Sequence, residues 1–181
     1  MADYRRRLPH EQPDGRALFL TWHLHGSLPH ARYPPPGKRN SGKAFVWMDR
    51  YLDTVREGPQ YLRRPEIAQI VVGAIRYAEE PLGLYVVDSY VVMSNHVHLL
   101  VEPFSEAKRF LKAVKNYSAR EANRLLGRTG PFWQAESYDH WVRDGKEMAR
   151  IREYIHQNPV KAGLVARAEE YRWSTSWRGE D

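Results

Sequence analysis

The chain has 181 residues, and 28 Lys and Arg against 22 Asp and Glu give it a formal net charge of +6. Because it contains no cysteine, disulfide frameworks, thiolate nucleophiles, cysteine-ligated zinc and iron–sulfur clusters are excluded, and any metal ion must bind through nitrogen and oxygen. Its longest apolar runs are far shorter than the ~20 residues that span a bilayer, so we expect a cytoplasmic protein without a membrane segment, in which residues 1–181 form one domain.

The first half of the chain predicts one strand, one loop, one helix and a hairpin. Residues 17–25 are rich in strand-forming side chains. Residues 28–42 hold four prolines and two glycines without periodicity, which predicts an exposed loop inside the domain. Residues 65–80 space their apolar side chains by three and four behind a proline, the pattern of an amphipathic helix. Residues 84–103 contain two β-rich runs separated near residues 93–95, as in an antiparallel hairpin.

The second half predicts two helices that flank a short extended segment. Residues 105–126 have helical periodicity, residues 131–144 are aromatic-rich and extended, and residues 146–157 are again helical. We expect Asn158 and Pro159 to end this last helix, because the residue before a proline is driven out of the helical region. The order strand, helix, strand, strand, helix, strand, helix predicts an α+β fold, a ferredoxin-like antiparallel sheet packed by helices.

Positive charge is concentrated in one segment. Residues 105–128 contain seven basic and two acidic side chains, and so carry +5 of the net +6. Such a cluster is typical of a polyanion binder, although a solvated helix face is an equal alternative. Aromatic residues beside basic ones further along the chain suit stacking and phosphate contacts with single-stranded nucleic acid. The candidate DNA-binding residues are Lys108, Lys112, Lys115, Arg120, Arg124, Trp133 and Arg143.

Two histidines stand at the start of an apolar strand. Side chains alternate across a strand, so His96 and His98 project from one face while Val97 points to the other. Two imidazoles held side by side suit a divalent cation bound through nitrogen. The alternative is a pair of half-buried histidines on an edge strand.

The last predicted helix carries a phenol and an amide one turn apart. Tyr154 and Asn158 are four residues apart and therefore share a face, which we expect to point outward. A phenol with a pKa near ~10 is a poor nucleophile, but it can attack a phosphodiester that a metal ion polarises. The alternative is that Tyr154 is a packing aromatic and Asn158 a helix cap.

In combination, these segments resemble a known family. The histidine hairpin, GPFWQAESYDHWVRD and IREYIHQNPVKAGLV are similar to the single-tyrosine HUH transposases, in particular to the REP-associated tyrosine transposase branch, over residues 17–173. The resemblance implies that His96 and His98 bind Mg²⁺ or Mn²⁺ on the central strand of the sheet. It also implies that Tyr154, which precedes Asn-Pro-Val-Lys, is the nucleophile, and that Asn158 is a third metal ligand. The chain departs from the family at Ser94, where a proline is common.

The resemblance also implies a function. A protein of this kind cleaves and rejoins single-stranded or REP-like hairpin DNA through a 5′-phosphotyrosine intermediate, and works as a monomer or a homodimer. Tyr117, in the most basic part of the chain, is an alternative nucleophile. A non-catalytic nucleic-acid-binding module with a ferredoxin-like sheet is the alternative function.

Overall fold

The structure is a computed structural model that describes residues 16–28, 41–54 and 58–179, and gives no side-chain description for residues 41–47. Most of the proline-rich loop predicted over residues 28–42 lies outside the described residues. No helix in the described part of the chain is both long and apolar enough to cross a membrane.

One antiparallel sheet forms the centre of the molecule, with its strands in the order β2-β3-β1-β4. The strands are β1 (Leu18–His23), β2 (Tyr85–Val92), β3 (His96–Pro103) and β4 (Tyr138–Trp141). All four were expected from strand-forming composition and turn signals, and the order confirms the predicted ferredoxin-like sheet. β1 and β3 are the two inner strands.

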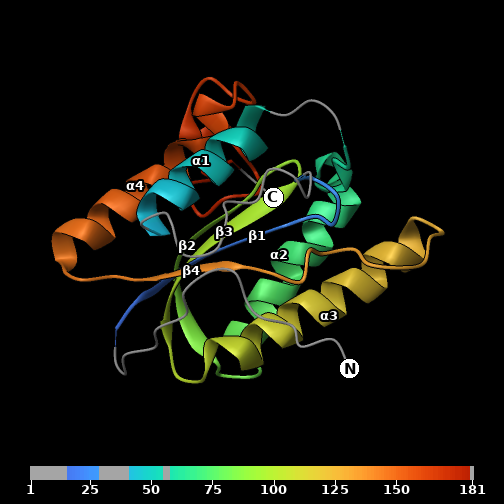
Figure 1. Ribbon diagram of the computed structural model, residues 1–181, viewed down its shortest axis with the longest axis horizontal. Coiled ribbons are helices and arrows are strands. Elements are labelled where there is room, and N and C mark those ends of the chain that lie inside the picture. The colour runs from blue at the N-terminus through green and yellow to red at the C-terminus, as the bar shows by residue number, and fades with distance from the viewer. Residues whose placement is uncertain (1–15, 29–40, 55–57, 180–181) are drawn as a thin grey trace.

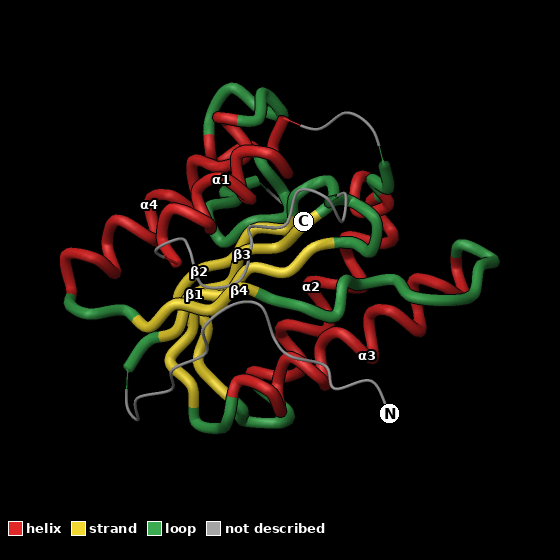
Figure 2. The backbone as a smooth tube through the Cα atoms, viewed as in Figure 1, coloured by secondary structure: helices red, strands yellow, loops and turns green. Residues whose placement is uncertain are grey.

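Helices cover both faces of this sheet. The helices α2 (Pro65–Glu79) and α3 (Ala107–Leu125) lie on one face, and α1 (Ser41–Thr54) and α4 (Gly145–Lys161) lie on the other, as Figures 1 and 2 show. Each layer of helices buries its own apolar cluster against the sheet. The predicted helices α2, α3 and α4 are therefore confirmed.

The alternation of side chains along β3 divides that strand between the two clusters. Val97, Leu99 and Val101 belong to the cluster beneath α2 and α3, whereas Leu100 belongs to the cluster beneath α1 and α4. By the same two-residue period, His96 and His98 lie on the α1 and α4 face. The apolar pattern of β3 therefore determines which face of the sheet carries the histidine pair.

The end of α4 differs from the prediction. The sequence predicts that the helix ends at Asn158 and Pro159, but α4 continues to Lys161 with Pro159 inside it. The amides of Ala162 and Leu164 donate to the carbonyls of Asn158 and Pro159, so the last turn stays hydrogen-bonded. Asn158 and Pro159 are both buried, and this packing outweighs the local preference of a proline to break the helix.

Candidate functional site

The imidazoles of His96 and His98 lie side by side on the inner strand β3. Their Nε2 atoms are 3.1 Å apart and their ring centroids 4.7 Å apart. The exposed fractions of the two residues are 1% and 0%. Because β3 pairs with a neighbour on each side, the alternative of two half-buried histidines on an edge strand is wrong.

Hydrogen bonds fix the orientation of both rings. The side-chain amide of Asn95 donates to the carbonyl of Leu52 at 3.1 Å, so its Oδ1 accepts from Nδ1 of His96 at 2.7 Å. His96 therefore carries its proton on Nδ1, and the lone pair of its Nε2 faces His98. Nδ1 of His98 lies 2.7 Å from Oγ1 of Thr21. When His98 donates this bond, both Nε2 atoms are available to one cation.

Burial keeps His96 in the form that can bind metal. Burial first, and then the positive charges that His98 and His23 would carry, lower the pKa of His96 well below its ordinary value. The ring is therefore neutral near pH 7, as a metal ligand must be.

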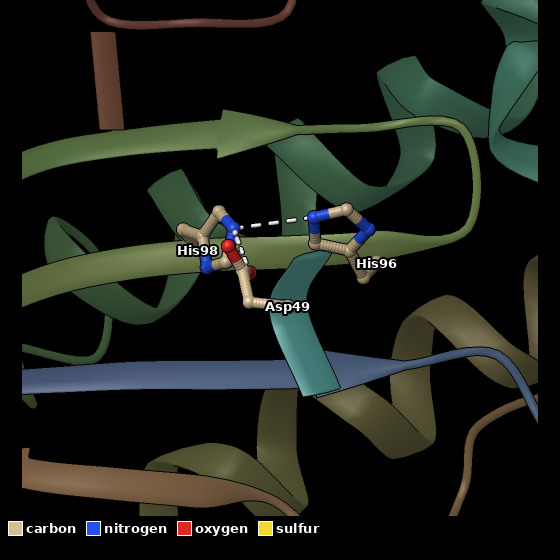
Figure 3. A group of neighbouring side chains, drawn as sticks. All are labelled: Asp49, His96 and His98. Atoms are coloured by element: carbon tan, nitrogen blue, oxygen red, sulfur yellow. Dashed lines mark hydrogen bonds and ion pairs between the residues drawn. The ribbon is translucent and has the colours of Figure 1, made fainter. Parts of the chain in front are cut away.

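A carboxylate from α1 completes a group that could hold a metal ion. Figure 3 shows Asp49 beside the two imidazoles, with its Oδ1 3.0 Å from Nε2 of His98. One ligand atom from each of Asp49, His96 and His98 lies within 4.8 Å of the others. Two donors that each bind one ion at about 2.1 Å and at right angles lie about 3.0 Å apart, so the spacing around His98 fits a shared ion.

A second acidic residue follows one turn later on α1. Oδ1 of Asp53 lies 3.5 Å from Nε2 of His96. Burial, and next the charge of Asp49, raise the pKa of Asp53 to about 7. Neither carboxylate is among the predicted ligands, because the sequence pattern predicts no helix over residues 41–54. The spacing of four between Asp49 and Asp53 was the available signal, since it places two acids on one helix face.

Asn158 approaches the pair from α4. Its side-chain Nδ2 lies 3.2 Å from Nε2 of His98, and the residue is 0% exposed. The prediction that it faces outward is therefore wrong: it points at the sheet. Its Oδ1 is buried and has no hydrogen-bond partner in the described part of the chain. Rotation of the amide exchanges the two atoms, and would offer this oxygen to an ion beside His98.

Tyr154 lies against the same imidazole and comes from the same chain. Its ring centroid is 5.4 Å from that of His98 and 6.2 Å from that of Phe19. Tyr117, the alternative nucleophile, is instead 48% exposed on α3, in the helix layer on the opposite face of the sheet. The sheet separates Tyr117 from the histidines, so only Tyr154 of the two candidates adjoins the pair within this chain.

Most of the predicted DNA-binding cations lie on the surface. α3 exposes Lys108, Lys112, Arg120 and Arg124, and Arg143 is exposed just before α4. The first two line a groove of about 460 Å³ between α3 and residues 130–139.

The structure gives the other two predicted DNA-binding residues internal partners. The ammonium of Lys115 donates to the carbonyls of Gln134 at 2.7 Å and Ala135 at 3.2 Å, and burial lowers its pKa to about 8. Trp133 is 6% exposed and donates from Nε1 to Oγ of Ser118 at 2.9 Å. Trp133 therefore packs largely in the core, but it also lines the groove between α3 and residues 130–139, and its contact with DNA stays a prediction.

Comparison with known proteins places the chain among transposases. The family model described as "Transposase IS200 like" matches residues 59–158, more than half of the chain. A Haemophilus influenzae protein that carries the name REP-associated tyrosine transposase is 27% identical over an alignment of 99 positions, which covers 48% of this chain and 56% of that protein. An uncharacterized protein of the same organism is 26% identical over an alignment of 102 positions, which covers 41% of this chain and 54% of that protein. The chain thus spans about half the length of these curated relatives.

A solved structure shares the fold. It is described as a REP-associated tyrosine transposase bound to a REP hairpin, and it matches with a TM-score of 0.57 and 19% identity over 99% of this chain and 93% of that chain. The segment matched by the family model includes the histidine pair, Tyr154 and Asn158. It includes neither α1, with Asp49, nor Lys161 at the end of α4.

Proposed function

The chain belongs to the IS200-like transposase family, and on this premise we propose that it cleaves and rejoins DNA through a covalent bond to Tyr154. The observation that supports this most directly is the position of the Tyr154 ring, 5.4 Å from the ring of His98. The candidate nucleophile thereby adjoins the candidate metal donors within one chain. The similarity to the Haemophilus influenzae protein is consistent with this proposal, since that protein carries the name of a tyrosine transposase.

We assign a divalent cation, Mg²⁺ or Mn²⁺, to the buried donor cluster. His96, His98 and Asn158 would hold it, together with Asp49 from α1. Two imidazoles, an amide oxygen and a carboxylate suit these hard or borderline ions. When bound, such an ion would polarise the scissile phosphate and stabilise charge on its non-bridging oxygens.

The residues of the chain have separate tasks in the reaction. Oη of Tyr154 attacks the phosphorus, and the bond between phosphorus and the 3′-oxygen breaks. The phenol gives up its proton, the departing 3′-oxygen takes one up, and a 5′-phosphotyrosine forms. A second 3′-hydroxyl reverses these bond changes and joins two strands. Thr21 and Asn95 hold the imidazoles in position throughout.

The DNA partner is proposed to be single-stranded or a REP-like hairpin. The solved structure with the same fold is described as bound to a REP hairpin, which supports this choice of substrate. Exposed cations on α3 and at Arg143 would contact the phosphates, because neutralising phosphate releases counterions. These contacts position the strand without reading its sequence.

The proposal is tested by incubating the protein with a panel of hairpin oligonucleotides and Mn²⁺. A denaturing gel should show a covalent protein–DNA adduct that EDTA prevents. Tyr154→Phe should abolish the adduct while oligonucleotide binding stays within about threefold of wild type, because the substitution removes one hydroxyl and keeps the ring. Tyr117→Phe is the matched control, and should form the adduct normally.

Two results would contradict the proposal. Adduct formation at normal yield by Tyr154→Phe would show that another group is the nucleophile. Binding that is insensitive to EDTA, with no covalent product from any oligonucleotide, would instead indicate a non-catalytic nucleic-acid-binding module.

A further inference from the structure

The face of α4 that carries Tyr154 borders a shallow groove of about 380 Å³. Four of its side chains recur at spacings of four, three and four along the helix, and therefore form one continuous stripe. The residues of this stripe are Arg150, Tyr154, Gln157 and Lys161. Ala149 and Glu153 complete the lining, so the groove has two positive side chains and one negative one.

Lys161 brings a positive charge to the nucleophile. Its Nζ lies 5.1 Å from the centroid of the Tyr154 ring, and the residue is exposed in the last turn of α4. It makes no ion pair within 4.0 Å in the described part of the chain. Lys161 therefore places a positive charge beside the phenol.

We propose that Lys161 is a catalytic residue that contacts a non-bridging oxygen of the scissile phosphate, an inference that rests on the proposed function of Tyr154. A phosphate that joins Oη of Tyr154 lies at the edge of a ring that already has the ammonium over its face. The lysine arm is long and flexible enough to follow that phosphate, and an ammonium–phosphate hydrogen bond is charge-assisted. Lys161 donates this bond in both directions of the reaction and transfers no proton.

A contact with the reacting phosphate makes a specific kinetic prediction. Interactions that strengthen as charge develops on phosphorus raise the rate of the chemical step more than they raise affinity. Lys161→Ala should slow single-turnover adduct formation at saturating oligonucleotide and Mn²⁺ by about tenfold to hundredfold. The dissociation constant for the oligonucleotide, measured by fluorescence anisotropy in a Tyr154→Phe background, should change by less than about threefold, since one of many phosphate contacts is lost.

Two further variants separate the contact from general charge and from helix stability. Lys146→Ala removes the same charge from an exposed position in the first turn of α4, and should leave the rate unchanged. Lys161→Arg keeps a cationic donor at the helix end, and should keep the rate within about fivefold of wild type. Equal rates for Lys161→Ala and Lys146→Ala would overturn the proposal.

An oligonucleotide with a neutral methylphosphonate at the scissile position tests whether the two groups meet. If Lys161 acts on that phosphate, Lys161→Ala should slow adduct formation with the methylphosphonate substrate by less than about twofold. The reason is that this substrate already lacks the negative charge that Lys161 would contact. If Lys161→Ala instead slows the reaction of both substrates by the same factor, the proposal is overturned, and the role of Tyr154 is unaffected. Failure of the wild-type protein to form any adduct would overturn the proposed function, and this inference with it.

Discussion

Two residues approach the same nitrogen atom from different helices. Asp49 of α1 and Asn158 of α4 lie 3.0 Å and 3.2 Å from Nε2 of His98. Only Asp49 is a carboxylate, and it lies outside the segment that the family model matches. Asp49 is therefore a candidate metal donor in addition to the residues within that segment.

Removal of that carboxylate should weaken metal binding to the free protein. We expect Asp49→Ala to raise the dissociation constant for Mn²⁺ by at least about tenfold, since even the loss of a group that only hydrogen-bonds to a ligand weakens metal binding by that factor. This dissociation constant is measured by electron paramagnetic resonance titration of Mn²⁺ in the absence of DNA. Glu80→Ala, which removes an exposed carboxylate at the end of α2, is the control. Unchanged Mn²⁺ affinity in Asp49→Ala would exclude Asp49 as a ligand.

The residues of the site differ in how far sequence could predict them. His96 and His98 share a face because of the strand period alone, and Tyr154 and Asn158 share one because of the helix period. Neither period says which face meets the sheet, which is why Asn158 was placed outward and is in fact buried. For Asp49, the four-residue spacing from Asp53 could indicate a shared helix face, but no local pattern shows where that helix docks.

At the scale of elements, α1 closes the site. The exposed fractions of His96, His98 and Asn158 are 1%, 0% and 0%, and the hydroxyl of Tyr154 is also buried. A DNA phosphate can touch these groups only after part of the covering layer moves. Of the two helices that cover this face of the sheet, α1 lies outside the family match, so we expect it to move and its Asp49 to give way to a phosphate oxygen.

Loosening α1 should therefore speed the reaction while it destabilises the fold. Met48 anchors α1 in the apolar cluster and is 5% exposed. Met48→Ala should lower the free energy of unfolding in urea by about 2–5 kcal/mol. It should nevertheless raise the single-turnover rate of adduct formation at saturating oligonucleotide, because less free energy is needed to move α1 away from the site. Ile75→Ala removes comparable core volume from α2, and should destabilise without acceleration. Equal slowing by both variants would mean that α1 stays in place.

The helices also show where local rules fail. α2 follows its prediction closely because a proline start and a clean apolar period agree. α1 was not predicted because residues 45–48 place four apolar side chains in succession, which blurs the helical period. In α4, the local signal of Pro159 is overridden by burial of Asn158 and Pro159. Tertiary packing decides both cases, and one sequence does not reveal it.

At the scale of the whole molecule, the sheet and α4 of a single chain supply both parts of the site. α4 packs on β2 and β3, and this contact brings Tyr154 to the histidines without a second copy of the chain. The ferredoxin-like order explains the arrangement, since it makes the histidine strand an inner one that a helix layer can cover. The sequence predicted this fold from the order of its elements and included α4, but it predicted neither α1 nor the pairing of α1 with α4 in a second layer.

A mixing experiment tests whether the proposed catalysis takes place within one chain. His98→Ala lacks a metal donor and keeps Tyr154, while Tyr154→Phe keeps the donors and lacks the nucleophile. If each chain uses its own tyrosine, a mixture of the two variants, preincubated together to allow subunits to exchange, should form no more adduct than either alone. Tags of different length let a denaturing gel identify which chain is linked to DNA. Adduct on the His98→Ala chain would show that a tyrosine from one copy acts at the metal site of another, which this arrangement of α4 on its own sheet does not require.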